Sequence, residues 1–486
     1  MRIELFLTLF RVHGMNGFYY VRLSWLSLAL VLGLANTSEG ASERHTPWTL
    51  SGAQERIEKH RMARVDLQVH LPGGTLLPSG SLVELELQEH AFQFGVSLAG
   101  SYVLYKEPTY HDILEQVDRL FNYITVAFYW RGNETRQGEW RLRKHSQQPL
   151  DWAHEKGKRV RGHPLVWHNV IPDWIEDKER DAAEIGDDIM QHAERLLTLY
   201  PEIDEWDIYN EAPVWEGIPG LHDTQLGIRR WMDLEGGPAS VTEKLALLIQ
   251  RIRPEADGLV NHFNLDHPSY HQMIQTCLER GVPIRGIGLQ SHMQDANSIW
   301  TEEYMWDLME AYGAYDIPIH FTEVTILSCE GVADWVEMQA WEEKRMTQRR
   351  AGEKPEQQKS TQALMQRQAA YARDFYTLAF SHPSVNTIVW WALSDVGVWR
   401  GLPGGLFDEK GRVKPVAKEL NRLINEEWHT HVRGRLKAAG EVPLKGFRGT
   451  YQLKVEHEGV RYRADFDLLD NAEKPVQVDL VRVDAE

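Results

Sequence analysis

The chain has 486 residues and a formal net charge of −18, because 71 aspartate and glutamate residues outnumber 53 lysine and arginine residues. This deficit of positive charge argues against a nucleic-acid-binding protein, since phosphate contacts need a basic face. Two cysteines cannot form a disulfide framework or a cysteine-rich zinc site. The 18 tryptophans favour sugar stacking only weakly, because tryptophan also fills protein cores.

The N-terminal residues predict export. Arg22 precedes an apolar run over Leu23–Leu34, and small and polar residues follow over Ala35–Ser42. This order is typical of a secretory signal peptide, and the run is short for a transmembrane helix. We therefore expect a signal peptide over residues 1–42, with an alternative start at Met15, and a secreted or periplasmic protein without stable membrane association. An uncleaved membrane anchor is the alternative.

Residues 43–90 predict a polar stretch followed by part of a small β module. Apolar and polar residues alternate over Val65–His70 and Leu82–Leu87, as expected of half-buried strands. A turn rich in glycine, proline and serine separates the two strands at Pro72–Ser81.

Residues 91–428 predict an α/β fold, a (β/α)8 TIM barrel. Short β-branched or aromatic runs alternate there with helix-sized connections, and a barrel needs eight such strands. A doubly wound open sheet is the alternative, but no glycine-rich nucleotide loop follows the first strand. The predicted strands are Phe92–Ser97, Tyr123–Phe128, Arg159–Leu165, Trp206–Asn210, Leu259–Asn264, Ile287–Gln290, Ile319–Val324 and Thr387–Trp391.

Two further segments complete the chain. Glu330–Thr361 is charged and rich in glutamine, which predicts a surface insertion made of a helix and a mobile loop, either solvated or involved in substrate access. We predict that residues 43–90 and 429–486 pack together as one sandwich-like accessory β module beside the barrel. The strands expected after Trp428 are Thr450–Glu456, Val460–Asp467 and Val476–Val481.

Two glutamates stand where a barrel carries its chemistry, at the C-terminal ends of strands. Glu211 ends the fourth strand in the sequence WDIYNEAP, and Glu323 ends the seventh strand in HFTEVTI. The ends of these two strands can face each other across the barrel mouth. A pair of carboxylates about 5–5.5 Å apart suits a retaining glycosidase, and their proximity raises the pKa of the acid/base member.

Further motifs surround the two glutamates in order. They are RGHPLVWH at Arg161–His168 with PDW at Pro172–Trp174, GIGLQSH at Gly286–His292, WWALSD at Trp390–Asp395, Trp399, and LFD at Leu406–Asp408. Together with WDIYNEA and HFTEVTI, these motifs resemble glycoside hydrolase family 10, the xylanase family. The resemblance extends from Phe92 to Leu423. It implies retaining hydrolysis of a polysaccharide or oligosaccharide substrate, without metal or cofactor.

The resemblance also implies a role for each matching residue. Glu211 would be the acid/base and Glu323 the nucleophile of a double displacement. The implied substrate-binding residues are Asn210 for the sugar 2-hydroxyl, His292 for the nucleophile carboxylate, Gln290 beside Glu211, His163 and Trp167 for the −1 subsite, and Trp391 and Trp399 for the glycone side.

Residue types alone leave alternatives open. His163 and His168 could be core or capping histidines. His163, His168 and His292 could instead be zinc ligands, although they lack a tight ligand motif. Trp391 could serve packing only. Export permits a disulfide between Cys277 and Cys329, but the sequence does not show whether they meet.

The second strand departs from the family pattern. Xylanases of this family usually carry Glu-Asn there and, three residues later, Lys, which hold sugar hydroxyls. In this chain Ala127, Phe128 and Arg131 occupy these positions. Because buried polar groups read sugar hydroxyls, the change alters the expected specificity. Either Tyr129, Trp130 or Arg131 rebuilds the glycone site, or these side chains only pack the rim of the barrel.

We therefore expect a secreted retaining β-glycosidase of the xylanase type that acts on β-1,4-linked xylan. A second hypothesis keeps the mechanism but changes the substrate to another β-glycan or β-glycoside. A third is a non-catalytic carbohydrate-binding homologue, which the presence of both glutamates, Asn210 and His292 disfavours.

His262 is a second departure from the family pattern, since the family often has aspartate at this position.

Overall fold

The structure is a computed structural model that describes most of the chain. The predicted signal peptide over residues 1–42 lies outside the described residues. Within the part that is described, no helix is long and apolar enough to cross a membrane. The described ranges are 48–104, 106–176, 179–213, 227–295, 298–472 and 474–483.

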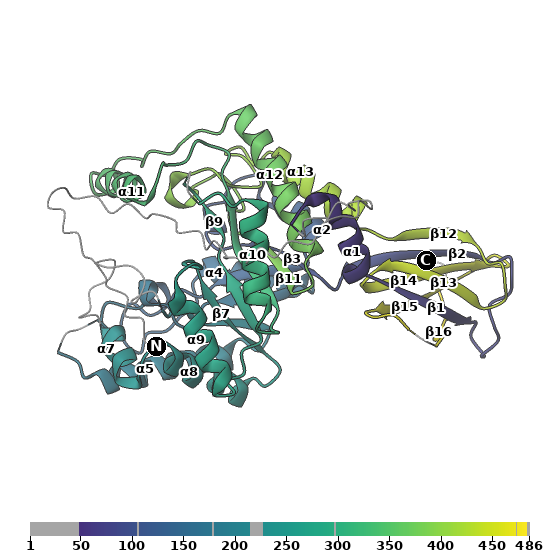
Figure 1. The fold of residues 1–486 in the computed structure, drawn as a ribbon, viewed down its shortest axis with the longest axis horizontal. Helices are drawn as coiled ribbons and strands as arrows, with labels where there is room; N and C mark the ends of the chain where they lie inside the picture. The colour runs from purple at the N-terminus through teal and green to yellow at the C-terminus, as the bar shows by residue number, and fades with distance from the viewer. Residues whose placement is uncertain are drawn as a thin grey trace, which may run out of the picture. The chain divides into compact units, whose positions relative to one another are not determined.

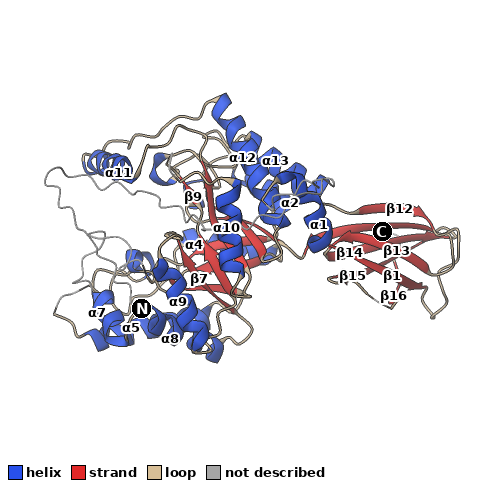
Figure 2. Cartoon of the chain, viewed as in Figure 1, coloured by secondary structure: helices blue, strands red, loops and turns tan. Residues whose placement is uncertain are grey.

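Eight parallel strands close into a barrel in the middle of the chain (Figures 1 and 2). The closure is made where β11 (Val385–Trp390) pairs with both β3 (Gln93–Ser97) and β10 (Ile319–Ile326). The predicted (β/α)8 barrel is therefore confirmed, and each predicted strand end lies within two residues of the observed one. The strands between β3 and β10 are β4 (Tyr123–Ala127), β5 (Arg159–His163), β6 (Glu205–Asn210), β7 (Asp257–His262) and β8 (Gly286–Leu289).

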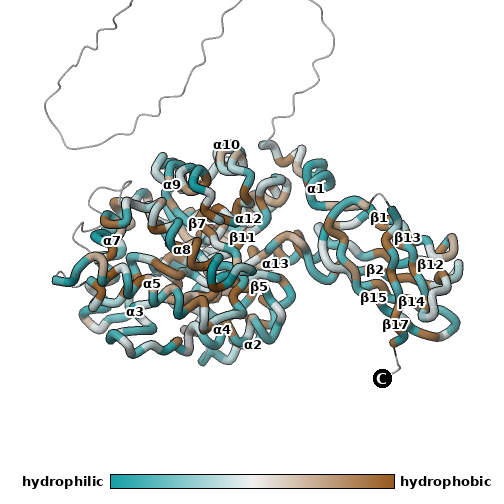
Figure 3. Tube along the Cα trace, turned by 90° about the horizontal axis from the view of Figure 1, so that it is seen from below, coloured by the Kyte–Doolittle hydropathy of each residue, from teal (hydrophilic) through white to brown (hydrophobic). Residues whose placement is uncertain are grey.

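Helices surround the barrel and bury one apolar stripe each. In α2 (Tyr110–Leu120) the buried side chains are Ile113, Leu114, Val117 and Leu120, a spacing that puts them on one face of a helix. Figure 3 shows brown stretches among the barrel strands near β7 and β11 and teal stretches on the surrounding helices. The other surrounding helices are α4 (Lys144–Glu155), α5 (Ala182–Leu199), α7 (Gly227–Glu235), α8 (Pro238–Ile252), α9 (Pro268–Glu279), α10 (Glu302–Gly313), α12 (Gln362–Ser381) and α13 (Pro415–Arg422).

The strands are buried on both faces, as expected of a parallel sheet covered by helices. All six residues of β6 are buried, although they alternate between apolar and polar types. Trp206 packs against Phe128, which directly follows β4, with ring centroids 5.0 Å apart. Gly162 on β5 has no side chain because a Cβ there would lie 2.4 Å from the Trp206 ring. The polar residues of the strands therefore fill the barrel interior.

The two terminal segments pair with each other in two sheets. In the first sheet, β1 (Met62–His70) lies between β13 (Glu441–Phe447) and β16 (Val476–Asp479). In the second, β2 (Leu82–His90) lies between two antiparallel partners, β12 and β14. The sequence did not predict the helix α1 (Ala53–Arg61) or the strands β12 and β13. The remaining strands of the second sheet are β12 (His431–Arg435), β14 (Gly449–His457), β15 (Val460–Leu468) and β17 (Val481–Arg482).

The insertion after β10 contains the expected helix. This helix, α11 (Trp335–Arg350), begins at Asp334, whose side chain accepts hydrogen bonds from two backbone N–H groups of the first turn. The two cysteines do not pair, because Cys277 and Cys329 are both buried and free.

Arg61 attaches α1 to the barrel. Its guanidinium donates hydrogen bonds to the carbonyls of Phe380 (2.6 Å), His382 (2.5 Å) and Val385 (2.6 Å) at the end of α12 and the start of β11. Its guanidinium carbon also lies 4.8 Å from the centroid of the Phe92 ring. The carbonyl end of a helix is partially negative, so a cation is favourable there without a carboxylate partner.

We expect Arg61→Met to destabilise the protein, because three buried carbonyls would lose a charged donor. The expected loss is about 2–4 kcal/mol of the free energy of unfolding. Lys59→Met is the matched control, since Lys59 is exposed two residues earlier on the same helix. Thermal and urea unfolding measure the effect, and equal stability of the two variants would contradict this role of Arg61.

Candidate active site

Glu211 directly follows β6, and Glu323 lies in the C-terminal half of β10. Each glutamate lies at or just after an irregularity in the strand pairing. The pairing of β6 with β7 shifts register between Asp207 and Asn210, and that of β10 with β11 shifts between Phe321 and Val324. Such bulges re-aim side chains and occur often beside active sites. They allow consecutive residues at each strand end to contribute to the barrel mouth.

Glu211 is held by two donors. Its Oε1 accepts a hydrogen bond from Gln290 Nε2 (2.9 Å), and its Oε2 accepts one from Trp167 Nε1 (2.9 Å). Its backbone adopts a φ of 62°, an uncommon value for a residue with a side chain, and its N–H bonds the carbonyl of Asn261. The neighbouring strand therefore maintains a strained backbone, which is typical of functional positions.

Glu323 has a different set of partners. Asn261 Nδ2 donates to Glu323 Oε1 at 2.8 Å, and His292 Nε2 lies 3.0 Å from Oε2. Arg161 Nη2 lies 3.8 Å from Oε1. His292 is itself positioned by the Thr325 hydroxyl, 2.9 Å from its Nδ1.

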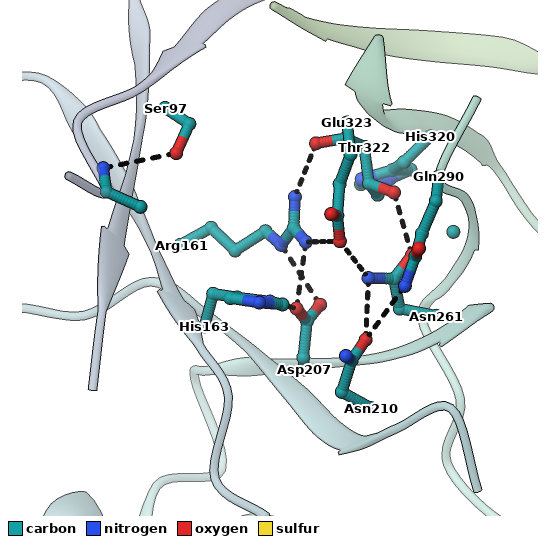
Figure 4. Close-up of polar contacts among 12 residues, drawn as sticks. Ser97, Arg161, His163, Asp207, Asn210, Asn261, Gln290, His320, Thr322 and Glu323 are labelled. Atoms are coloured by element: carbon teal, nitrogen blue, oxygen red, sulfur yellow. Dashed lines mark hydrogen bonds and ion pairs between the residues drawn. The ribbon is translucent and has the colours of Figure 1, made fainter. Parts of the chain in front are cut away.

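Amide side chains connect the two carboxylates. Figure 4 shows two of them, Asn261 and Gln290, converging on Asn210. Asn261 donates to Asn210 Oδ1 (2.9 Å) as well as to Glu323, and Gln290 reaches the same Asn210 oxygen (3.4 Å) as well as Glu211. Both amide bonds to Asn210 end on its oxygen. Its Nδ2 is buried and has no hydrogen-bond partner among the described residues. Asn210 therefore keeps a donor for a group that enters the barrel mouth.

A fully buried ion pair lies beneath this network. Arg161 donates from Nε and Nη2 to the two oxygens of Asp207 (3.0 and 2.8 Å) and from Nη1 to the carbonyl of Thr322 (3.2 Å). His163 Nδ1 bonds Asp207 as well. Figure 4 shows these side chains converging inside the barrel. The pKa of Asp207 lies below its ordinary value, because Arg161 and His163 outweigh the effect of burial.

The two glutamates differ in acidity. Burial raises the pKa of Glu211 to about 7; the negative charge of Glu323 adds to this rise, and the hydrogen bonds from Gln290 and Trp167 oppose it. Burial also acts on Glu323, but the His292 hydrogen bond and the surrounding positive groups outweigh it and hold its pKa below the ordinary value. One site thus holds a proton donor beside an ionised carboxylate.

Aromatic rings line the mouth around this pair. The Trp391 ring lies 5.4 Å from His163 and 6.0 Å from His292, and the Trp399 ring lies 4.9 Å from His292. Trp399 is 44% exposed, so part of its side chain remains available for a ligand. These positions suit stacking on the apolar face of a sugar.

The family model for glycosyl hydrolase family 10 matches residues 84–422. The chain belongs to glycosyl hydrolase family 10. It is 30% identical over 186 residues to a beta-1,4-xylanase of Dictyoglomus thermophilum, covering 36% of this chain and 49% of that protein. It is 22% identical over 361 residues to endo-1,4-beta-xylanase B of Thermotoga neapolitana, covering 71% of this chain and 92% of that protein.

Solved structures show the same fold. The crystal structure of xylanase 10B from Thermotoga petrophila RKU-1 in complex with xylobiose is 19% identical with a TM-score of 0.53, and the match covers 69% of this chain and 95% of that chain. The structure of a family 10 protein from Paenibacillus barcinonensis is 20% identical, also with a TM-score of 0.53, covering 69% and 96%. Membership of family 10 makes this chain a glycoside hydrolase.

In this family 10 chain, most side chains that follow β4 do not rebuild the glycone site. Phe128 faces outward and packs against Tyr200, while Trp130 is buried and stacks on His192 with ring centroids 3.9 Å apart. The structure does not bring Arg131 to the carboxylates: its Nε donates to the carbonyl of Ile171 at 2.9 Å.

Tyr129 is the residue of this stretch that reaches the site. Its ring lies 6.0 Å from His163 and 5.9 Å from Trp167. Burial raises the pKa of Tyr129, and the charges of Glu323 and Glu211 raise it further. The partly exposed side chain of Tyr129 therefore lines the mouth. It lies beside Ala127 and Phe128, which occupy the positions where the family usually has Glu and Asn.

Three residues inside the barrel were not predicted as site residues: Arg161, Asp207 and Asn261. Arg161 and His163 are two residues apart on β5, so strand periodicity places them on the same face. Asp207 lies on β6 within WDIYNEA, and Asn261 is the penultimate residue of β7. A charged residue within an apolar strand was the available signal for Arg161 and Asp207. Among the described residues, no three histidine, cysteine, aspartate or glutamate side chains form a metal-ligand group.

We expect Glu323→Gln to lower the pKa of Glu211 below about 7, because it removes the negative charge that opposes ionisation of Glu211. Carbon-13 NMR titration of labelled glutamate side chains measures this pKa. Glu330→Gln is the matched control, since Glu330 is exposed in the connection that follows the same strand. A Glu211 pKa that rises or stays constant in the Glu323 variant would contradict the coupling.

Proposed function

We propose that this chain is a secreted retaining β-glycosidase that cleaves β-1,4-xylosidic bonds by double displacement. The observation that carries the proposal is the pair of glutamates, one with its pKa raised to about 7 and the other held ionised. The apolar run over Leu23–Leu34 supports export.

The reaction would use the two carboxylates in turn. Ionised Glu323 attacks the anomeric carbon while protonated Glu211 gives its proton to the leaving glycosidic oxygen, which forms a glycosyl ester and releases the first sugar product. Glu211, now ionised, takes a proton from water as that water attacks the anomeric carbon, and Glu323 leaves. The free Nδ2 donor of Asn210 would bond a sugar hydroxyl, a contact that can strengthen as positive charge develops on the ring.

Xylan is the proposed substrate because the two relatives described above are named xylanases, and one solved relative holds xylobiose. A second candidate substrate, another β-glycan or β-glycoside, is favoured by the end of β4. There Ala127 and Tyr129 offer an apolar surface where polar side chains would read sugar hydroxyls, and such a change alters specificity sharply.

We expect the wild-type chain to release the β-anomer first from a panel of xylan, mixed-linkage glucan, aryl β-xylosides and aryl β-glucosides, as followed by proton NMR. Glu323→Ala abolishes turnover, and azide then restores cleavage of an activated aryl β-glycoside as the α-glycosyl azide. Glu211→Ala lowers kcat by on the order of 10²–10⁴ for poor leaving groups, and azide then gives the β-glycosyl azide.

Glu330→Ala is the control glutamate and keeps wild-type turnover. Absence of turnover on the whole panel would refute the enzyme, activity in Glu323→Ala would refute the nucleophile, and preference for glucosides would favour the second substrate.

The pH profile follows from the two pKa values. Catalysis needs Glu211 protonated and Glu323 ionised, so kcat/KM falls as pH rises through about 7 and falls again only below the ordinary glutamate range. Gln290→Met removes a hydrogen bond that lowers the pKa of Glu211, so the alkaline limb moves upward. Gln275→Met, on the exposed side of α9, leaves both limbs in place. An alkaline limb that moves downward in Gln290→Met would contradict the assignment.

A further inference from the structure

The insertion after β10 is attached to the loop that carries Trp399. The indole of Trp341 on α11 donates to the carbonyl of Arg400 at 2.7 Å. Beyond the helix, Gln358 N–H bonds the carbonyl of Gly401 at 2.9 Å. The helix α11, labelled in Figure 1, is thus connected to the rim of the barrel mouth through the segment Trp399–Gly401.

Arg400 is held between two tryptophan rings. Its guanidinium carbon lies 4.3 Å from the centroid of Trp399 and 5.5 Å from that of Trp335, the first residue of α11. Its Nε lies 2.9 Å from Glu342, and its Nη1 donates to Gln294 at 3.1 Å. Its backbone φ is 58°, so the residue keeps an uncommon conformation to hold this place.

This arrangement continues outward from the proposed nucleophile. His292 lies against Glu323 on one side and within 4.9 Å of the Trp399 ring on the other. The Arg400 guanidinium lies next to the Trp399 ring, and the Trp335 ring lies next to the same guanidinium. Glu211 is near enough to act on Arg400: burial lowers the pKa of Arg400, while the charges of Glu342 and Glu211 raise it.

Trp335 remains 40% exposed, close to the 44% of Trp399. Two open indole rings with a guanidinium between them combine apolar stacking faces with hydrogen-bond donors, which is the chemistry that sugar rings need. A surface for a protein partner would need a broad apolar patch, whereas charged Glu342 and Arg400 interrupt this one.

We infer that Trp335, together with Trp399 and Arg400, forms an outer sugar-binding subsite for a distal unit of the same β-glycan chain that enters the barrel mouth. The inference rests on the proposed function for its ligand. The insertion then extends the substrate-binding cleft, and Trp335 determines how strongly the enzyme prefers long chains over short ones.

The test compares xylohexaose with an aryl β-xylobioside in the full chain. In Trp335→Ala the ratio of kcat/KM for the long substrate to that for the short one falls roughly tenfold, as expected for the loss of one stacking contact. Trp335→Phe retains most of the ratio because it keeps a ring. Val336→Ala is the matched control, since Val336 is the neighbouring residue and 73% exposed, and its ratio equals that of the wild type.

The outcomes separate this inference from the proposed function. If the kcat/KM ratio of long to short substrate in Trp335→Ala equals that of the wild type, the subsite is overturned and the proposed hydrolase is not. The subsite is also overturned if the oligomeric mass of this variant changes while the ratio does not. If the wild type cleaves neither substrate, the proposed function fails. Calorimetry of xylohexaose binding to Glu323→Ala with and without Trp335→Ala then decides the subsite: roughly tenfold weaker binding in the double variant supports it, and equal or absent binding overturns it.

Discussion

The barrel interior depends on one fully buried guanidinium. Arg161 on β5 bonds the carboxylate of Asp207 on β6 and the carbonyl of Thr322 on β10, so a single side chain connects three strands. A buried charge without partners is strongly unfavourable, and removal of one member of such a pair leaves an uncompensated charge. The Arg161–Asp207 pair therefore requires β5, β6 and β10 to keep the register in which these groups meet inside the barrel. The two glutamates stand at the ends of strands that Arg161 has already aligned, and its positive charge helps to keep Glu323 ionised.

The difference between the two glutamates follows from their donors rather than from their burial. Both carboxylates are buried. Glu211 accepts hydrogen bonds from neutral groups, Gln290 and Trp167, which do not offset burial, whereas Glu323 is surrounded by His292 and Arg161. Ionised Glu323 then raises the pKa of Glu211 further. The proposed general acid and the proposed nucleophile thus arise from the same residue type, because one environment stabilises negative charge and the other does not.

The sequence predicted the eight barrel strands and the two glutamates because both signals are local: apolar runs of strand length, and motifs at their ends. The register shifts after Asp207 and Phe321 depend on how neighbouring strands pair, and no local pattern records them. For the same reason, the sequence did not decide which side chains after β4 reach the site and which only pack the rim. Once the strand was placed, alternation turned Phe128 outward and Tyr129 toward the mouth. The helix α1 was missed because its apolar face contributes only two buried residues, Ala53 and Ile57.

Chemistry and specificity are built by different layers of this barrel. The proposed catalytic layer consists of strand-end residues linked by hydrogen bonds of 2.8–3.4 Å, in which Asn261 and Gln290 connect both carboxylates through Asn210. A change in any of these side chains would disturb two or three partners. The rim is held by contacts from loops and from α11, such as those of Arg400 with Trp335, Glu342 and Gln294, so it can change without removing the hydrogen bonds of the carboxylates. That separation explains how the end of β4 can depart from the family pattern while the catalytic layer keeps it.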